Sequence, residues 1–171
     1  MPKKYVLFSI LIIASVFLSG CIFDNNNTST KPNQTIGPDF IPRTNLPPGF
    51  TFMGVHEITT DIANKSVSGF EGVYRYGGDD IYIMAIKSDK PEVLLSQYKA
   101  DIKQKLREDY NPFDEISING HAATKLTDII IRDGKNVPRY SIIWANKDYM
   151  ILVGSFSDVN PVIVLASATG Y

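Results

Sequence analysis

The amino-acid sequence predicts an α+β domain, in which a curved antiparallel sheet of about six to seven strands packs on one long helix and a short C-terminal helix follows. Three observations predict this class. Apolar segments of strand length alternate with turn signals at Gly and Asn, which is typical of antiparallel hairpins. Residues 90–109 change to a helical period. Residues 161–168 form a last, short apolar segment that begins at a proline. The expected order is β-β-β-α-β-β-β-β-α.

The composition limits the class of protein. The chain has 171 residues, is 44% hydrophobic and carries a net charge of -1, which suits one globular domain once terminal segments are set aside. The near-neutral charge argues against a nucleic-acid-binding protein, because such proteins carry a basic excess. The single cysteine excludes an intrachain disulfide framework and a cysteine-rich metal site.

Residues 1–20 have the parts of a secretory signal peptide. Lys3 and Lys4 form a short positive region, and residues 5–18 form an uncharged apolar run that small residues follow. The run is short for a membrane-spanning helix, which needs roughly 20 apolar residues. We therefore expect the rest of the chain to lie on the extracytoplasmic face of the cell membrane.

The residues that follow the apolar run resemble the lipobox of membrane lipoproteins, and they are Leu18, Ser19, Gly20 and Cys21. The resemblance implies cleavage before Cys21 and attachment of lipid to its thiol, a reaction that needs a sulfur nucleophile. One acyl chain binds a membrane only weakly, so a stable anchor implies at least two chains. The alternative is an uncleaved signal anchor, because extending the apolar run through Phe23 nearly reaches the length of a membrane span.

A flexible tether is expected between the lipid and the domain. Residues 24–45 are rich in Asn, Thr and Pro and poor in apolar side chains, so they cannot bury enough surface to offset the entropy of ordering. Such a segment has a typical reach of ~25 Å. The chain is thus divided into a signal peptide (residues 1–20), a lipidated cysteine with a tether (residues 21–45) and a single globular domain (residues 46–171).

The first β block holds three expected strands. Residues 50–58 follow a turn rich in Pro and Gly. Residues 69–76 and 80–87 form an expected hairpin around Gly77 and Gly78, where glycine supplies a positive φ. Because both faces of this hairpin carry apolar side chains, we expect it at the centre of the sheet.

The long helix is predicted over residues 90–109. Pro91 suits a first turn, and Asp89 is the expected N-cap. Asp101 and Lys105 have the spacing of a favourable ion pair. The apolar residues of the predicted stripe recur every four positions, and they are Leu94, Tyr98, Ile102 and Leu106.

The second β block contains hairpins and then the short helix. Asn119 and Gly120 form the strongest hairpin signal, and Asn160 is the expected cap of the helix over residues 161–168, which closes one end of the sheet. The strands are expected over residues 114–118, 121–131, 137–145 and 149–156.

This second block resembles uncharacterised lipoprotein domains of archaea and Gram-positive bacteria. The resemblance is carried by the Asn119 and Gly120 hairpin, by strands that contain Trp144 and begin at Tyr149, and by the short terminal helix. It covers the last third of the chain and implies no catalytic residues.

The chain contains no sequence motif of a nucleophile elbow, a zinc-protease helix or a phosphate-binding loop. His56 and His121 lie in separate β segments, and Asp79 and Asp80 are explained by turn chemistry although their oxygens also suit calcium. Adjacent strand residues point to opposite faces, so these two carboxylates do not suit glycoside hydrolysis. We expect no enzymatic activity, no cofactor and no metal site.

Aromatic residues offer the strongest candidate binding surface. Tyrosine and tryptophan combine an apolar body with a polar tip, which suits interfaces, although aromatic residues also fill the cores of sheets. The candidate residues are Tyr74, Tyr76, Tyr82 and Trp144.

The first functional hypothesis is a lipid-anchored, non-enzymatic surface protein that binds a protein partner, such as a membrane protein complex, near the membrane. The alternative is a small-ligand or solute-binding module with a pocket between helix and sheet. A hydrolase of envelope polymers ranks third. Partner and ligand identity are left open.

Overall fold

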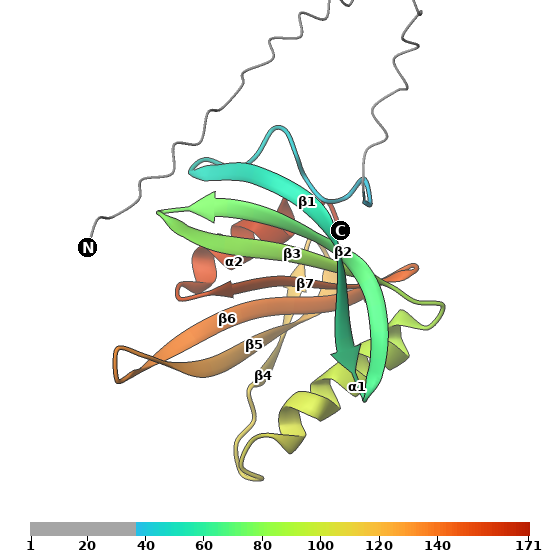
Figure 1. The fold of residues 1–171 in the computed structure, drawn as a ribbon, viewed down its shortest axis with the longest axis vertical. Helices are drawn as coiled ribbons and strands as arrows, with labels where there is room; N and C mark the ends of the chain where they lie inside the picture. The colour runs from blue at the N-terminus through green and yellow to red at the C-terminus, as the bar shows by residue number, and fades with distance from the viewer. Residues whose placement is uncertain (1–36) are drawn as a thin grey trace, which may run out of the picture. The chain divides into compact units, whose positions relative to one another are not determined.

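The computed structural model describes residues 37–171, which form the elements labelled in Figure 1. The order of strands and helices is the one predicted. The elements are β1 (Phe50–Ile62), β2 (Lys65–Tyr76), β3 (Asp79–Lys87), α1 (Pro91–Gln104), β4 (Phe113–Ile118), β5 (His121–Arg132), β6 (Lys135–Asn146), β7 (Tyr149–Phe156) and α2 (Val159–Ser167).

The predictions for the N-terminus lie outside the described residues. These are the signal peptide, the first part of the tether, and the lipobox residues Leu18, Ser19, Gly20 and Cys21. Within residues 37–171, neither helix combines the length and the apolar composition that a membrane span requires.

All seven strands form one antiparallel sheet in the order β1-β2-β3-β7-β6-β5-β4. The sheet consists of two meanders, β1 to β3 and β4 to β7, and α1 connects them. The second meander returns so that β7 pairs with β3 at the centre. The α+β class and the antiparallel sheet are thereby confirmed. The predicted hairpin of residues 69–76 and 80–87 lies inside the sheet, with β2 next to the edge strand β1 and β3 next to the central strand β7.

The turns explain where the strands begin and end. Asn119 and Gly120 have φ values of 50° and 82°, as the hairpin signal predicts. Ala63 and Asn64 have φ values of 52° and 59° and form a turn that the sequence analysis did not identify. As a result, β1 extends to Ile62 and pairs with β2 along its length.

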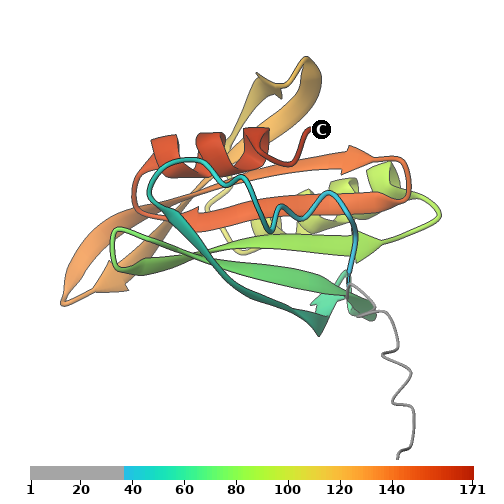
Figure 2. The same cartoon turned by 90° about the horizontal axis from the view of Figure 1, so that it is seen from above.

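The sheet buries both faces, and each face has its own helix. Alternate residues of β3 point to opposite faces, so Ile83 and Met84 belong to separate hydrophobic clusters. The cluster on the first face includes Val162 and Leu165 of α2, and that on the second face includes Leu94 of α1. We call these the α2 face and the α1 face. Figure 2 shows α2 lying along the sheet.

The predicted packing of one long helix requires correction. The helix α1 ends at Gln104 rather than at residue 109, and Leu94 is its only buried residue. The shorter α2 packs along β6 and β7 instead of only closing an end, and it contributes more to the core. The physical reason is that β3 and β7 are apolar on both faces, so each face needs a cover. The buried residues of α2 are Pro161, Val162, Leu165 and Ala166.

Both predicted helix caps differ from the structure. Lys90 occupies the N-cap of α1 without a side-chain hydrogen bond, so Asp89 does not cap it. In α2 the cap is Asp158, whose carboxylate accepts a hydrogen bond from the backbone N–H of Asn160. The carboxylate of Asp101 accepts a hydrogen bond from the N–H of Ala63, which ties α1 to the β1–β2 turn.

The predicted tether ends earlier than residue 45. In residues 37–45, Ile41 is buried in the core and lies above Gly72, which has no side chain to block it. The hydroxyl of Tyr74 donates a hydrogen bond of 2.7 Å to the carbonyl oxygen of Pro42. Residues 37–45 therefore pack on the α2 face through the apolar side chains of Phe40 and Ile41.

Candidate functional site

The four aromatic candidates do not form a binding surface. Tyr74 and Trp144 are only 0% and 2% exposed, and both belong to the core of the α2 face. Tyr76 packs against the rings of Phe50 and Phe156. Tyr82 alternates with buried residues of β3 and lies on the opposite face. Tyr74 and Trp144 therefore fill the core, and the four candidate rings do not share one exposed surface.

The histidine and aspartate candidates remain separate in space. Nε2 of His56 lies 3.3 Å from the carboxylate of Glu71, and Asp80 pairs with Arg75. His121 is exposed at the start of β5. Among residues 37–171, no group of three or more His, Cys, Asp or Glu side chains has the arrangement of a metal site.

A projecting hairpin is the first feature that suits binding. β4 pairs with β5 only as far as Leu126, and β7 pairs with β6 only from Tyr140 onward. Residues 127–139 therefore form a two-stranded extension that no other strand of residues 37–171 flanks, and we call this extension the arm. Figures 1 and 2 both show the arm extending beyond the rest of the sheet.

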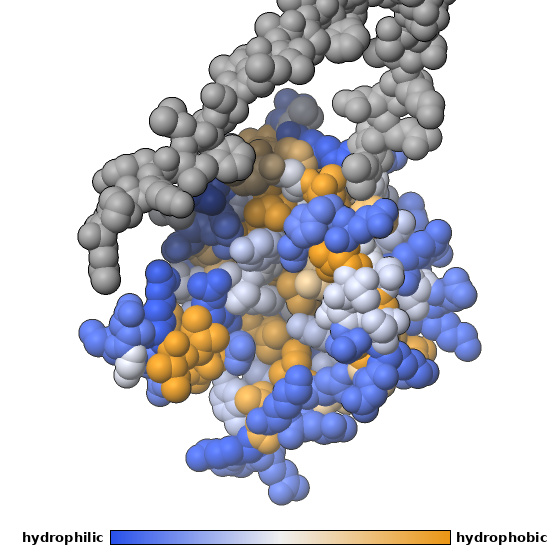
Figure 3. All heavy atoms as spheres, viewed as in Figure 1, coloured by the Kyte–Doolittle hydropathy of each residue, from blue (hydrophilic) through white to orange (hydrophobic). Residues whose placement is uncertain are grey.

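The arm exposes large apolar side chains. Ile129 is 54% exposed and Ile131 is 78% exposed, and they lie opposite Pro138 and Asn136 in the register. Figure 3 shows apolar atoms gathered over this hairpin between hydrophilic neighbours. Large apolar residues that cluster at the surface mark interaction sites more often than scattered ones do. The charged residues of the arm are Asp128, Arg132, Asp133, Lys135 and Arg139.

The base of the arm is held firmly. The guanidinium of Arg139 donates hydrogen bonds to the hydroxyl and to the carbonyl oxygen of Ser155. The hydroxyl of Tyr110 donates a hydrogen bond of 3.3 Å to the carbonyl oxygen of Thr127. A hollow of about 260 Å³ adjoins this base, and its apolar lining includes Leu106 and Ile129. The exposed apolar surface thus continues from the arm into a recess that a partner side chain can fill.

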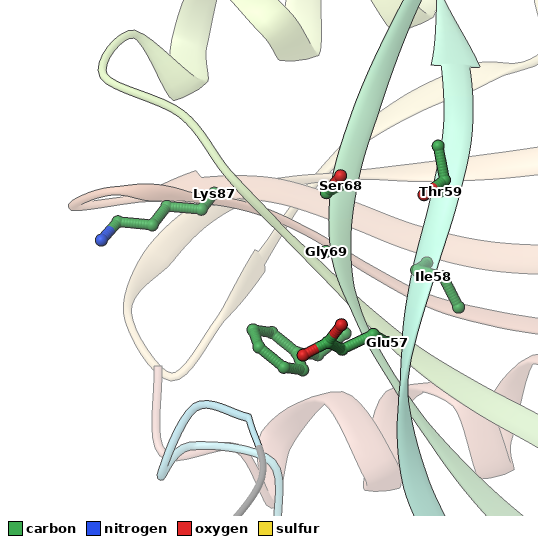
Figure 4. A pocket seen from close by; sticks show the side chains of 7 residues that line it. Glu57, Ile58, Thr59, Ser68, Gly69 and Lys87 are labelled. Carbon is green, nitrogen blue, oxygen red and sulfur yellow. The ribbon is translucent and has the colours of Figure 1, made fainter.

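A second feature is a hollow of about 550 Å³ over β1, β2 and β3, which we call the β1–β3 hollow. Figure 4 shows it from close by. The polar and aromatic side chains that line it are Glu57, Thr59, Ser68, Phe70 and Lys87.

A third recess, of about 220 Å³, lies between α1 and the sheet. Nζ of Lys99 is 3.1 Å from the carboxylate of Glu115, which also accepts a hydrogen bond from the buried hydroxyl of Thr124. These groups satisfy one another, so they hold α1 against β4 and β5.

Sequence reasoning did not find the arm or the β1–β3 hollow. The apolar run of residues 129–131 is visible in the sequence, but an apolar run is also expected in a buried strand. The hollow depends on the register of three strands, which the sequence analysis did not derive.

No protein-family model and no curated protein matches the sequence. The chain is similar to a solved structure described as a GTP binding regulator from Thermotoga maritima. The two chains are 13% identical, the match covers 71% of this chain and 75% of the other, and the TM-score is 0.41.

Proposed function

We propose that this chain is a lipid-anchored, non-enzymatic protein of the extracytoplasmic membrane face, which binds a protein partner through the arm. The observation that carries the proposal is the exposed apolar surface of Ile129 and Ile131 on a hairpin that no other strand of residues 37–171 flanks. The lipobox-like residues that end at Cys21 support the anchor. The partner's class follows from the chemistry of the arm.

The arm suits a protein better than a lipid surface. Its apolar side chains are bordered by charges of both signs, as in interfaces that have an apolar core and a polar rim. A surface that binds anionic lipid by charge would instead carry a cluster of four or more cations. The strand edges of the arm also offer unpaired backbone groups, to which a partner strand can add.

The position of the arm fits a tethered protein. The described chain begins at Gly37, beside Phe70 of β2. Figures 1 and 2 show that the start of the described chain and the tip of the arm lie on different sides of the domain. The described chain therefore enters the domain away from the arm.

A pair of matched variants tests this function. Ile129→Thr and Ile131→Thr together keep β-branched residues in the strand and remove apolar surface from the arm. Ile163→Thr is the control, since Ile163 is also exposed, at 36%, but lies on α2. The full chain is cross-linked gently in its native membrane, solubilised with its anchor and purified.

We expect a partner that copurifies in a fixed ratio with the unmodified chain and with Ile163→Thr. The arm variant should recover at least about tenfold less partner, as the loss of ~1.4 kcal/mol of binding free energy would produce. Equal recovery with the arm variant would contradict the proposed function.

Small-ligand binding is a second candidate function. The β1–β3 hollow favours it, because its volume of about 550 Å³ falls within the range of ligand pockets. It differs from the predicted pocket in lying over three strands rather than between a helix and the sheet.

A further inference from the structure

The side chains of the β1–β3 hollow lie in two rows on one face of the sheet. Glu57 is opposite Phe70, and Thr59 is opposite Ser68, in the register of β1 with β2. Residues that lie opposite each other in an antiparallel pair share a face. The last pair in the register of β2 with β3 is Gly69 with Ile86. Lys87 follows Ile86 and therefore lies beside Ser68. Because Phe70 packs against the core of the α2 face, this is the face that carries the hollow.

The hollow carries opposite charges at two separate positions, Glu57 on β1 and Lys87 on β3. Neighbouring strands lie about 4.8 Å apart and a two-residue step covers ~7 Å, so the Cα atoms of Glu57 and Lys87 are separated by roughly 12 Å. Figure 4 shows the two charged groups well apart. Neither takes part in an ion pair within residues 37–171.

The groups between the charges suit a backbone-like ligand. The hydroxyls of Thr59 and Ser68 can each donate and accept hydrogen bonds. Phe70 shares the row of Glu57, and an aromatic ring beside a carboxylate favours an ammonium group through its negative face. Gly37 packs against one side of the Phe70 ring, since a Cβ added to Gly37 would lie 3.3 Å from that ring.

We propose that the β1–β3 hollow binds a short zwitterionic peptide of about three residues. Its amino terminus lies against Glu57 and Phe70, and its carboxylate lies against Lys87. An extended chain spans at most ~3.3–3.6 Å per residue, so about three residues match the roughly 12 Å between the Cα atoms of Glu57 and Lys87. A free amino acid is too short to reach both. The proposal rests on this hollow alone and is independent of the arm.

The test is calorimetric titration of the full chain, purified in detergent, with triglycine as the probe. N-acetyl-triglycine removes the positive charge of the probe, and triglycine amide removes the negative charge. We expect saturable binding of triglycine and at least about tenfold weaker binding of both blocked probes. Failure of triglycine to bind, or equal binding of a blocked probe, would overturn the proposal.

Two matched pairs of variants assign the charges. Glu57→Gln should weaken triglycine binding at least about tenfold, whereas Glu71→Gln, one strand away on the α1 face, should not. Lys87→Gln should have the same effect as Glu57→Gln, whereas Lys65→Gln, at the start of β2 and on the α1 face, should not. Equal losses in a variant and its control would contradict the assignment of the hollow.

A further control separates this site from the arm. The Ile129→Thr and Ile131→Thr variant should bind triglycine as the unmodified chain does. Loss of peptide binding in that variant would place the peptide on the arm and refute the hollow as its site. Thermal unfolding of every variant tests whether the substitutions leave the fold intact.

Discussion

Tyr74 is the residue that joins the entering chain to the sheet. Its ring is buried in the core, and its hydroxyl donates a hydrogen bond to Pro42. Burial raises the pKa of the Tyr74 phenol above its ordinary value, while the nearby charge of Arg43 opposes the shift. The neutral phenol is therefore the form that the fold requires.

Replacement of Tyr74 by Phe should have two effects. At neutral pH the carbonyl oxygen of Pro42 loses its donor, and the free energy of unfolding should fall by about 1 kcal/mol. Because the folded pKa is raised, stabilisation by the neutral phenol is full below the unfolded value of about 10 and is lost as the pH rises through the folded value. The unmodified chain should thus lose more stability above about pH 10 than Tyr74→Phe does.

Urea unfolding at about pH 8 and about pH 11 measures both effects. The other titrating groups affect both proteins equally, so their contribution cancels when the free energy of unfolding of Tyr74→Phe is subtracted from that of the unmodified chain. An identical loss of stability in both proteins at high pH would show that Tyr74 is not the group that burial protects.

At the scale of elements, the contact of residues 37–45 with β2 decides where the domain begins. A Cβ on Gly72 would lie 2.7 Å from Cγ2 of Ile41 and 3.3 Å from the hydroxyl of Tyr74. Gly72 therefore provides the space in which the entering segment packs.

Gly72→Ala should destabilise the domain by about 1–3 kcal/mol, because it forces Ile41 out of its place. Ile41→Ala should cost about 2–5 kcal/mol on its own. When both changes are combined, the added Cβ at position 72 no longer clashes with Cγ2 of Ile41. The total cost should therefore be smaller than the sum of the two separate costs. A double-mutant cycle by urea unfolding measures this coupling, and strictly additive costs would contradict the proposed packing.

The elements also show how far sequence reasoning reaches. The turn at Asn119 and Gly120 was predictable, since these residue types favour positive φ. The turn at Ala63 and Asn64 was not, because alanine gives no such signal. The burial of Trp144 was not predictable either, since a strand with apolar residues on both faces does not reveal which of its rings are buried.

At the scale of the whole molecule, the proposed protein combines a lipid anchor with a binding domain. Intact-mass measurement of the chain from its native membrane tests the anchor. Lipidation predicts a mature chain that begins at Cys21 and carries at least two acyl chains, and Cys21→Ser should lack that added mass. A full-length mass without lipid would instead indicate the uncleaved signal anchor.

The whole-molecule prediction was correct for the strand and helix order, because hairpin turns and the helical period are local signals. The candidate sites were not predictable in the same way. The arm exists because β5 and β6 extend beyond β4 and β7, and the β1–β3 hollow exists because three strands bring distant residues side by side. Both depend on strand pairing, which composition and spacing do not determine.

The most direct test of partner binding through the arm is photo-crosslinking in the native membrane. A photoreactive amino acid replaces Ile131 at the tip of the arm, and the same residue replaces Ile163 on α2 as the control. We expect one protein adduct of defined mass from position 131 and none from position 163. Adducts with lipid alone, or the same adducts from both positions, would contradict the claim that the arm binds a protein partner.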